Sequence, residues 1–300
     1  IKKSHSCIHK TRGVTYDFIR KNNRECSVGL ICRTLDISRS AYYRYISGKY
    51  RSQRSIENAV LLEKIRMIYL KSKRTYGSPR ITAALRNEGI KVGKNRVAGI
   101  MKLNSISVKV RQKRRNYMRN KERQINTDLV VRQFNPLNRN RIWGSDITYI
   151  RTKQGWKYLS VVMDLYSRMI IAWKVYDSQN ENIIIRAIET AVKNRNPKSG
   201  LIFHSDRGTQ YCSTRVRSTL EYYGISQSMG AKATCYDNAV LESFFSTLKK
   251  ELIYREKYFN LEDLQKSLFE YIEIFYNRER KHSTLGYLSP FEFESKNDIN

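Results

Sequence analysis

The chain has 300 residues, and its 57 Lys and Arg against 27 Asp and Glu give a formal net charge of +30. Hydrophobic residues make up 40% and aromatic residues 11%, enough for a sizeable core, which excludes wholesale disorder. No hydrophobic run approaches the ~18 residues of a membrane span, and the N-terminal region lacks the apolar stretch of a secretory signal. No membrane partner is therefore expected.

The positive charge is concentrated in the first half of the chain. Residues 1–150 hold 35 Lys and Arg against 9 Asp and Glu, whereas residues 151–300 hold 22 against 18. A chain this basic repels itself unless it meets a polyanion, and nucleic acid is favoured over an anionic membrane surface. The first half therefore predicts a DNA-binding region, and the second half is closer to an ordinary enzyme domain.

Residues 1–50 predict a helix-turn-helix region. Apolar side chains at helical spacing lie on both sides of a polar turn at 35–38, and Ser38 suits the N-cap of the following helix. That helix carries four side chains able to contact DNA, namely Arg39, Tyr42, Tyr43 and Arg44. The pattern alone fits a small helical hairpin with a basic surface equally well.

Two further basic segments follow. Residues 55–108 predict a second helical DNA-binding region, interrupted by a turn at 76–80 (YGSPR). Residues 109–123 hold eight Lys or Arg and one acid, so the region 109–135 is expected to be a basic linker, either solvated or tracking the DNA backbone. Pro136 marks the boundary of the next domain.

The sequence changes character after this boundary. Helical and strand-like runs alternate, so residues 136–295 are expected to form an α/β domain with a mixed sheet flanked by helices. The first three strands are joined by short turns and predict an antiparallel meander, at 141–151, 157–165 and 169–175.

Three acids of this domain stand out by position. Asp146 lies within a predicted strand, where aspartate is disfavoured unless its carboxylate points into a site. Asp206 directly follows a short buried strand, and the carboxyl ends of sheet strands commonly bind ligands. Glu242 flanks the apolar stripe of a predicted helix over 238–252, and Lys249 lies about two turns further along that flank. Spacing alone also allows an ordinary surface glutamate at this position.

Three converging carboxylates would suit metal-assisted phosphoryl transfer. Hard cations such as Mg²⁺ take carboxylate oxygens, and two ions ~4 Å apart can assist an in-line displacement at phosphorus. Asp146, Asp206 and Glu242 are therefore candidate metal ligands. Asp164, inside a predicted strand and near Arg168, is expected to be structural.

Several segments carry a family resemblance. Three of them resemble the catalytic motifs of insertion-sequence transposases, the OrfB product of the IS-three family: 143–148 (WGSDIT), 204–211 (HSDRGTQY) and 237–245 (DNAVLESFF). Between Asp206 and Glu242 lie 35 residues, as in the Asp-Asp-Glu triad of that family, and Lys249 matches its basic position. Segments further out are also similar, at 37–43, 76–81 and 276–287.

The resemblance implies a ribonuclease-H-like integrase core at 136–295, preceded by all-α helix-turn-helix units, and the activity of a DNA transposase. Asp146, Asp206 and Glu242 would be its catalytic residues and would hold Mg²⁺, replaceable by Mn²⁺, as two ions. Lys249 would steady substrate DNA. Water would free a 3′-OH at an element end, and this 3′-OH would then attack target DNA.

The expected partner is double-stranded DNA, both element ends and target, bound by a homo-oligomer in the bacterial cytoplasm at the nucleoid. The chain begins at Ile1, so a fragment, an unusual start codon and a fusion to a small upstream product all stay open. Two other functions also stay open: a DNA-binding regulator without catalysis, and a metal-dependent nuclease without strand transfer. The charge division further predicts that fragments 1–135 and 136–300 separate at Pro136, with the second folding alone.

Overall fold

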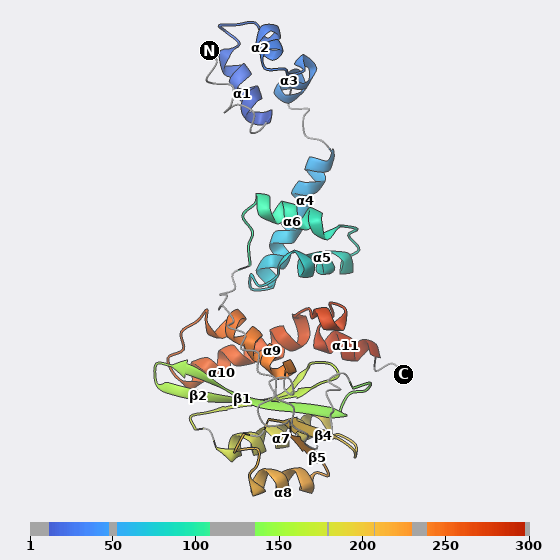
Figure 1. Ribbon diagram of the computed structural model, residues 1–300, viewed down its shortest axis with the longest axis vertical. Coiled ribbons are helices and arrows are strands. Elements are labelled where there is room, and N and C mark those ends of the chain that lie inside the picture. Colours follow the sequence, from blue (N-terminus) through green and yellow to red (C-terminus); the bar gives the residue numbers. More distant parts are fainter. Residues whose placement is uncertain are drawn as a thin grey trace, which may run out of the picture.

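The computed structural model describes residues 12–47, 53–108, 136–178, 180–206, 208–229 and 239–297. These residues form a small three-helix unit, a second three-helix unit and a larger α/β core, arranged along the long axis of the molecule (Figure 1). The expected basic linker at 109–135 lies outside the described residues. Within the described part of the chain, no helix has the length and apolar character needed to cross a membrane.

The first helical unit contains α1 (Arg12–Asn22), α2 (Val28–Thr34) and α3 (Arg39–Ile46). The predicted turn between α2 and α3 is present, and Asp36 within it has a positive φ of 52°. Ser38 occupies the predicted N-cap of α3 with an extended backbone, although its side chain makes no capping hydrogen bond.

The second helical unit contains α4 (Gln53–Lys71), α5 (Ser78–Asn87) and α6 (Lys94–Leu103). Gly77 is the N-cap of α5, and Pro79 lies in its first turn, where the missing N–H has no intrahelical partner to lose. The apolar sides of the three helices face one another and bury a common set of side chains: Leu61, Ile65, Ile81, Leu85, Val97 and Ile100.

The core is built on one five-stranded mixed sheet with the order β3-β2-β1-β4-β5. The predicted antiparallel meander is confirmed, and β4 and β5 extend the sheet in parallel beyond β1. The strands are β1 (Ile142–Thr152), β2 (Gly155–Asp164), β3 (Ile170–Tyr176), β4 (Ile202–Ser205) and β5 (Ser226–Met229).

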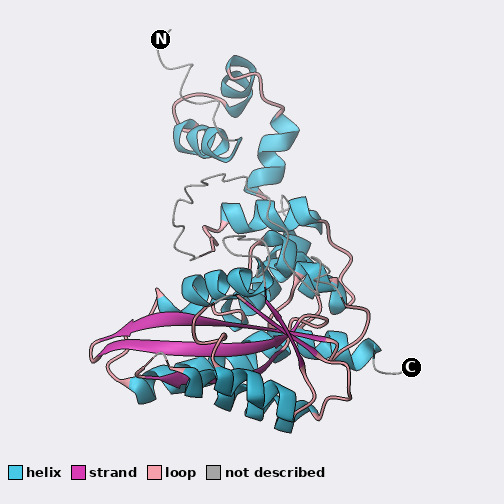
Figure 2. Ribbon diagram, turned by 60° about the horizontal axis from the view of Figure 1, so that its bottom comes forward, coloured by secondary structure: helices cyan, strands magenta, loops and turns pink. Residues whose placement is uncertain are grey.

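Helices cover both faces of this sheet (Figure 2). The face that carries Trp143 and Val162 packs against α7 (Glu181–Arg195) and α8 (Thr214–Tyr222). The face that carries Ile142 and Val161 packs against α9 and the helices that follow it. The first of these are α9 (Ala239–Leu248) and α10 (Leu261–Phe269). The short 3₁₀ turn η4 (Ser283–Leu285) and α11 (Pro290–Asn297) end the chain's regular structure.

Two helices of the core change type partway along. The helix expected over 238–252 becomes the π-helix η2 (Lys249–Ile253) after α9, and α10 continues into the π-helix η3 (Glu270–Glu279). A π-turn takes in an extra residue and so rotates the side chains that follow it. In η2 three consecutive side chains are consequently buried, those of Glu251, Leu252 and Ile253.

Candidate active site

Two neighbouring parallel strands bring the first two predicted carboxylates together. In the β1–β4 ladder Gly144 pairs with His204 and Ser145 with Ser205. Asp146 comes next in β1 and Asp206 directly follows β4, so the same register brings them side by side at the end of β4.

Gly144 allows the third carboxylate to approach. A Cβ atom on Gly144 would lie 3.0 Å from side-chain atoms of both Leu165 and Leu241, so α9 rests directly on β1 at this point. Gly144 and Asp146 point to the same face of the sheet because side chains alternate along a strand. Glu242, next to Leu241, is therefore held on the face that carries Asp146. A glycine inside a strand often marks such a close approach, a signal the sequence interpretation left unused.

The carboxylate of Asp146 lies in a negative, partly desolvated environment. Burial raises its pKa to about 7, and the nearby charges of Asp206 and Glu242 act in the same direction. A hydrogen bond from the Ile147 N–H (2.7 Å) and the charge of Lys249 oppose this shift without cancelling it. A bound cation would neutralise this negative charge and so stabilise the ionised carboxylates.

A buried hydroxyl pair supports the segment after Asp206. The Tyr211 hydroxyl lies 2.8 Å from Ser145 Oγ, and Gln227 Nε2 donates to the Tyr211 carbonyl at 2.9 Å. Burial, together with the charge of Asp146, holds the pKa of Tyr211 well above its ordinary value, so the ring stays neutral. Tyr211 and Ser145 were not predicted as site residues. Their long-range contact links positions 66 residues apart and has no local signature.

Lys249 lies at the start of η2, beside this group of acids. Its Nζ is 5.0 Å from the centroid of the Tyr149 ring, and its charge acts to lower the pKa of Asp146. The structure thus brings the predicted basic residue to the same end of the sheet as the predicted carboxylates.

Asp164 occupies a different environment. Its carboxylate is fully buried and accepts hydrogen bonds from the backbone N–H groups of Asn140 (2.8 Å) and Tyr166 (3.0 Å). Burial raises its pKa to about 6. These contacts fasten the loop after β2 to the segment before β1, which agrees with the predicted structural role.

The predicted DNA contacts of the first helical unit divide into two groups. Arg39, Tyr43 and Arg44 are exposed on α3, whereas Tyr42 is only 3% exposed. The Tyr42 ring packs with Tyr16 and the other apolar side chains of this unit. Because Tyr42 is buried, its ring contributes to packing. Of the four predicted contacts on α3, only Arg39, Tyr43 and Arg44 are exposed enough to contact a DNA groove.

The carboxylates fit a divalent cation by chemistry, since all three supply hard oxygen donors. As they stand, no three Asp, Glu, His or Cys side chains within the described ranges form a group tight enough to hold a metal ion. What supports the fit is the chemistry of the donors and their shared end of the sheet, where the charges of Asp206 and Glu242 both act on Asp146.

Comparisons of the sequence with known families match most of the chain. The Integrase core domain matches residues 136–235, and a second family of the same description matches residues 223–290. The HTH-like domain matches residues 55–114.

Individual relatives come from bacterial insertion sequences. The chain is 36% identical over 289 residues to the transposase InsF for insertion sequence IS3A of Escherichia coli (strain K12), covering 94% of this chain and 99% of the relative. It is 34% identical over 269 residues to a 31 kDa protein of insertion element IS600 of Shigella sonnei, covering 89% and 98%. A chain of the simian T-cell lymphotropic virus intasome is similar with 14% identity and a TM-score of 0.47, covering 79% of this chain and 76% of that chain.

Proposed function

The chain belongs to the IS3 family of insertion-sequence transposases, and we propose that Asp146, Asp206 and Glu242 are the catalytic carboxylates of its DNA cleavage and strand transfer. The protein is a DNA transposase with a polynucleotidyl transferase core. The observation that carries the proposal is geometric: the β1–β4 register brings Asp146 and Asp206 to one end of the sheet, and the close approach of α9 at Gly144 holds Glu242 on the same face.

The proposed chemistry consists of two displacements at phosphorus. In the first, a water oxygen bonds to the phosphorus at the element end, and the bond to the 3′ oxygen breaks to leave a 3′-OH. In the second, that 3′ oxygen bonds to a phosphorus of target DNA, whose own 3′ oxygen leaves. Each step forms one P–O bond and breaks one, so no covalent bond between protein and DNA is required.

The three carboxylates would hold Mg²⁺, or Mn²⁺ in its place, as two ions. When bound, the ions would activate the attacking oxygen and neutralise charge on the leaving oxygen. Gly144 keeps Glu242 close to Asp146, and the Tyr211–Ser145 pair holds the segment that follows Asp206. Lys249 would contact a DNA phosphate beside the carboxylates.

The helical units would hold the DNA ends. Arg39, Tyr43 and Arg44 on α3 would enter a groove of the DNA, and the second unit would bind the adjacent duplex. Cleavage at two ends and joining to one target would require more than one copy of the chain, so a homo-oligomer on DNA is part of the proposal. A product of the upstream reading frame would be a fusion partner or a separate subunit.

The rival functions differ in what they require. A regulator without catalysis needs no acids at the end of the sheet and is not favoured by the chain's likeness to transposases over nearly its full length. A nuclease would use the same acids but stop after hydrolysis. A strand-transfer assay with a pre-cleaved 3′-OH end separates these two activities.

The test replaces each carboxylate by its neutral isostere in the full chain. Asp146→Asn, Asp206→Asn and Glu242→Gln should each abolish cleavage and joining in Mg²⁺ while leaving binding to end DNA within about twofold, because shape is kept and charge is lost. Glu189→Gln, an exposed acid on α7, is the matched control and should remain active. Near-normal strand transfer by any one carboxylate variant would remove that residue from the proposed set.

A further inference from the structure

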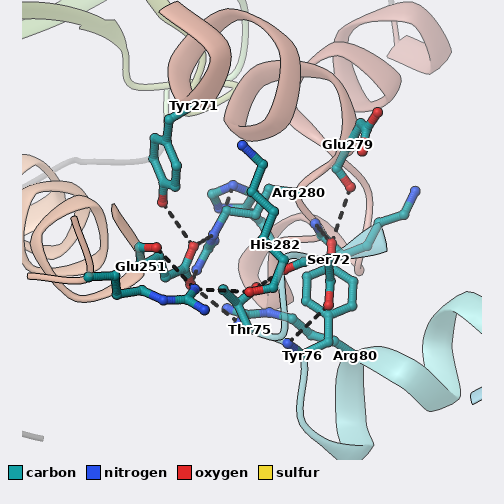
Figure 3. Close-up of polar contacts among 12 residues, drawn as sticks. Ser72, Thr75, Tyr76, Arg80, Glu251, Tyr271, Glu279, Arg280 and His282 are labelled. Carbon is teal, nitrogen blue, oxygen red and sulfur yellow. Dashed lines mark hydrogen bonds and ion pairs between the residues drawn. The ribbon is translucent and has the colours of Figure 1, made fainter. Parts of the chain in front are cut away.

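A buried polar junction joins the second helical unit to the catalytic core (Figure 3). At its centre, Arg280 donates to both carboxylate oxygens of Glu251, from Nε and from Nη2, each at 2.9 Å. The Tyr271 hydroxyl donates to the same carboxylate at 2.8 Å. All three side chains are buried, so the charges hold a fixed geometry.

The second helical unit completes this junction from the other side. The Tyr76 hydroxyl donates to the Glu279 carbonyl at 3.2 Å and accepts from the Lys281 N–H at 2.7 Å. Arg80 places Nη1 at 4.0 Å from Glu251, so two guanidinium groups share one carboxylate. Burial, followed by the charge of Arg280, lowers the pKa of Arg80.

The turn that carries Tyr76 is itself held by the core. Lys73 and Arg74 both have positive φ, 52° and 62°, a conformation that non-glycine residues rarely adopt. Arg255, from the segment after η2, donates to the Lys73 carbonyl at 2.9 Å. Strained backbone of this kind persists only where the surroundings determine it. Contact with the core is one of the interactions that hold Lys73 and Arg74 in this conformation.

The junction lies on the same helical rod as the proposed active site. Glu242 is in α9, Lys249 begins η2, and Glu251 follows two residues later without a break in the rod. The nine residues from Glu242 to Glu251 correspond to a rise on the order of 10 Å. A rotation of the second helical unit about the junction would therefore have to strain the rod or break the buried contacts.

We propose that Glu251, with Arg80 and Tyr76, is a positioning device that sets the register of the bound element end relative to the catalytic carboxylates. The inference rests on the proposed function, since it takes Glu242 as catalytic and the second helical unit as a DNA holder. A purely apolar contact would stabilise the docking but would tolerate small rotations. The shared carboxylate, with its directional hydrogen bonds, permits one orientation.

The experiment uses Arg80→Gln and Tyr76→Phe in the full chain. Three quantities are measured: the Kd for an end duplex, the single-turnover cleavage rate, and the nucleotide at which the strand is cut. We expect binding within about twofold of the wild type but a rate lower by on the order of 10- to 100-fold, the loss typical of a misplaced reacting group. Cuts should also spread to neighbouring nucleotides, which a general loss of stability would not produce.

Arg215→Gln is the matched control, because it also breaks an Arg–Glu contact, to Glu181, but away from the junction. It should cut at the normal nucleotide at the normal rate. Glu251→Gln leaves two guanidinium groups without their carboxylate. Its cleavage rate and cut position are therefore compared with those of Arg80→Gln only if its melting temperature shows that the variant is folded.

If both Arg80→Gln and Tyr76→Phe keep the wild-type rate and cut position, the inference fails. A rate that falls only in proportion to DNA affinity would also overturn it. Loss of the proposed function appears separately, as cleavage that survives Glu242→Gln.

An independent observation concerns the β1–β2 hairpin next to Lys249. Tyr149 and Trp156 are 60% and 45% exposed, and their rings meet edge to face with centroids 5.3 Å apart. Each ring carries a cation, Lys249 over Tyr149 at 5.0 Å and Arg151 over Trp156 at 5.2 Å. The charge of Lys249 also acts on Asp146, so this aromatic strip lies next to the proposed catalytic carboxylates.

We also infer that this strip binds unpaired DNA beside the reacting phosphate. Exposed rings offer faces for bases to stack on, and the flanking cations match the phosphate charge. A peptide partner would gain much less from these cations unless it were acidic. The strip is thus assigned to a single strand or a frayed end rather than to duplex DNA.

The probe is a short oligothymidylate, with binding followed by anisotropy on the full chain. Trp156→Ala should weaken binding by about 10-fold, as expected for the loss of one stacked base. Phe291→Ala is the matched control, since Phe291 is 46% exposed and pairs with Arg278 at 5.3 Å elsewhere on the core. Equal losses in both variants, or no loss in Trp156→Ala, would overturn the assignment.

Discussion

The two helical units are both basic and built of three helices, but they differ in how they are attached. The first unit buries its own cluster of side chains, which includes Tyr16, Ile19, Ile31 and Tyr42. The second unit has no separate core, because its buried side chains belong to one continuous cluster with those of β1, β2 and α9. Both units are basic, yet only the first is packed as an independent body.

This difference changes where the chain can be divided. Charge alone predicts a division at Pro136, with the second fragment folding alone. Packing instead predicts that the chain divides between the first helical unit, which ends with α3, and the second, which begins with α4. A division at Pro136 would expose the apolar and polar surfaces that the core shares with α4, α5 and the turn between them.

The largest expected effect comes from comparing two truncations. A fragment 53–300 should unfold cooperatively and keep metal-dependent cleavage, whereas 136–300 should lose its sharp thermal transition and associate through the uncovered face. Circular dichroism melting and size-exclusion chromatography report the two outcomes. A monomeric 136–300 that melts like the longer fragment would show that the shared core is dispensable.

The next largest effect is expected from creating a cavity in the core of each helical unit. Leu85→Ala and Ile19→Ala each remove a fully buried side chain, and each should lower the free energy of unfolding by about 2–5 kcal/mol. Calorimetry should show Leu85→Ala moving the transition of the α/β core and Ile19→Ala leaving it in place. If Leu85→Ala affected only a small separate transition, the second unit would have to be independent.

A smaller effect is expected from pH on the metal-free chain. The folded-state pKa of Asp146 is raised to about 7, so its contribution to stability is complete at low pH and is lost as pH rises through 7. Between pH 5 and 8 the core should lose about 2 kcal/mol relative to Asp146→Asn, because the variant has no charge to bury. The transition of the first helical unit serves as the internal control and should show no such difference.

The smallest effect concerns DNA contacts of the first unit. Arg39→Ala or Arg44→Ala should weaken end binding a few-fold and reduce the slope of log K against log salt by about 1, if each contacts a phosphate. Tyr42→Phe should change neither quantity, since its ring is buried. A salt titration of end binding gives both numbers. An unchanged slope in both arginine variants would move the DNA contact away from α3.

Much of the catalytic core follows from local patterns in the sequence. Short runs rich in β-branched and aromatic side chains, bounded by turns, mark β1 and β2, and an apolar stripe spaced at helical intervals marks α9. Asp146 and Asp206 stand out as well, since an acid within or directly after a buried strand needs a special explanation.

Other features depended on contacts between distant segments. Tyr42 and Tyr43 are neighbours of the same type, and only packing against α1 decides that the first is buried. The change from α9 to η2 has no local marker, yet it turns Glu251 inward.

The charge, the candidate acids and the elements that carry them can be predicted from the sequence, because they depend on residue type and short spacing. How the parts are joined depends on tertiary contacts. Glu251 and Arg280 are 29 residues apart, and Tyr76 lies 205 residues before Lys281. Contacts over such separations form when whole elements dock, and docking depends on the shapes of surfaces that no short stretch of sequence contains.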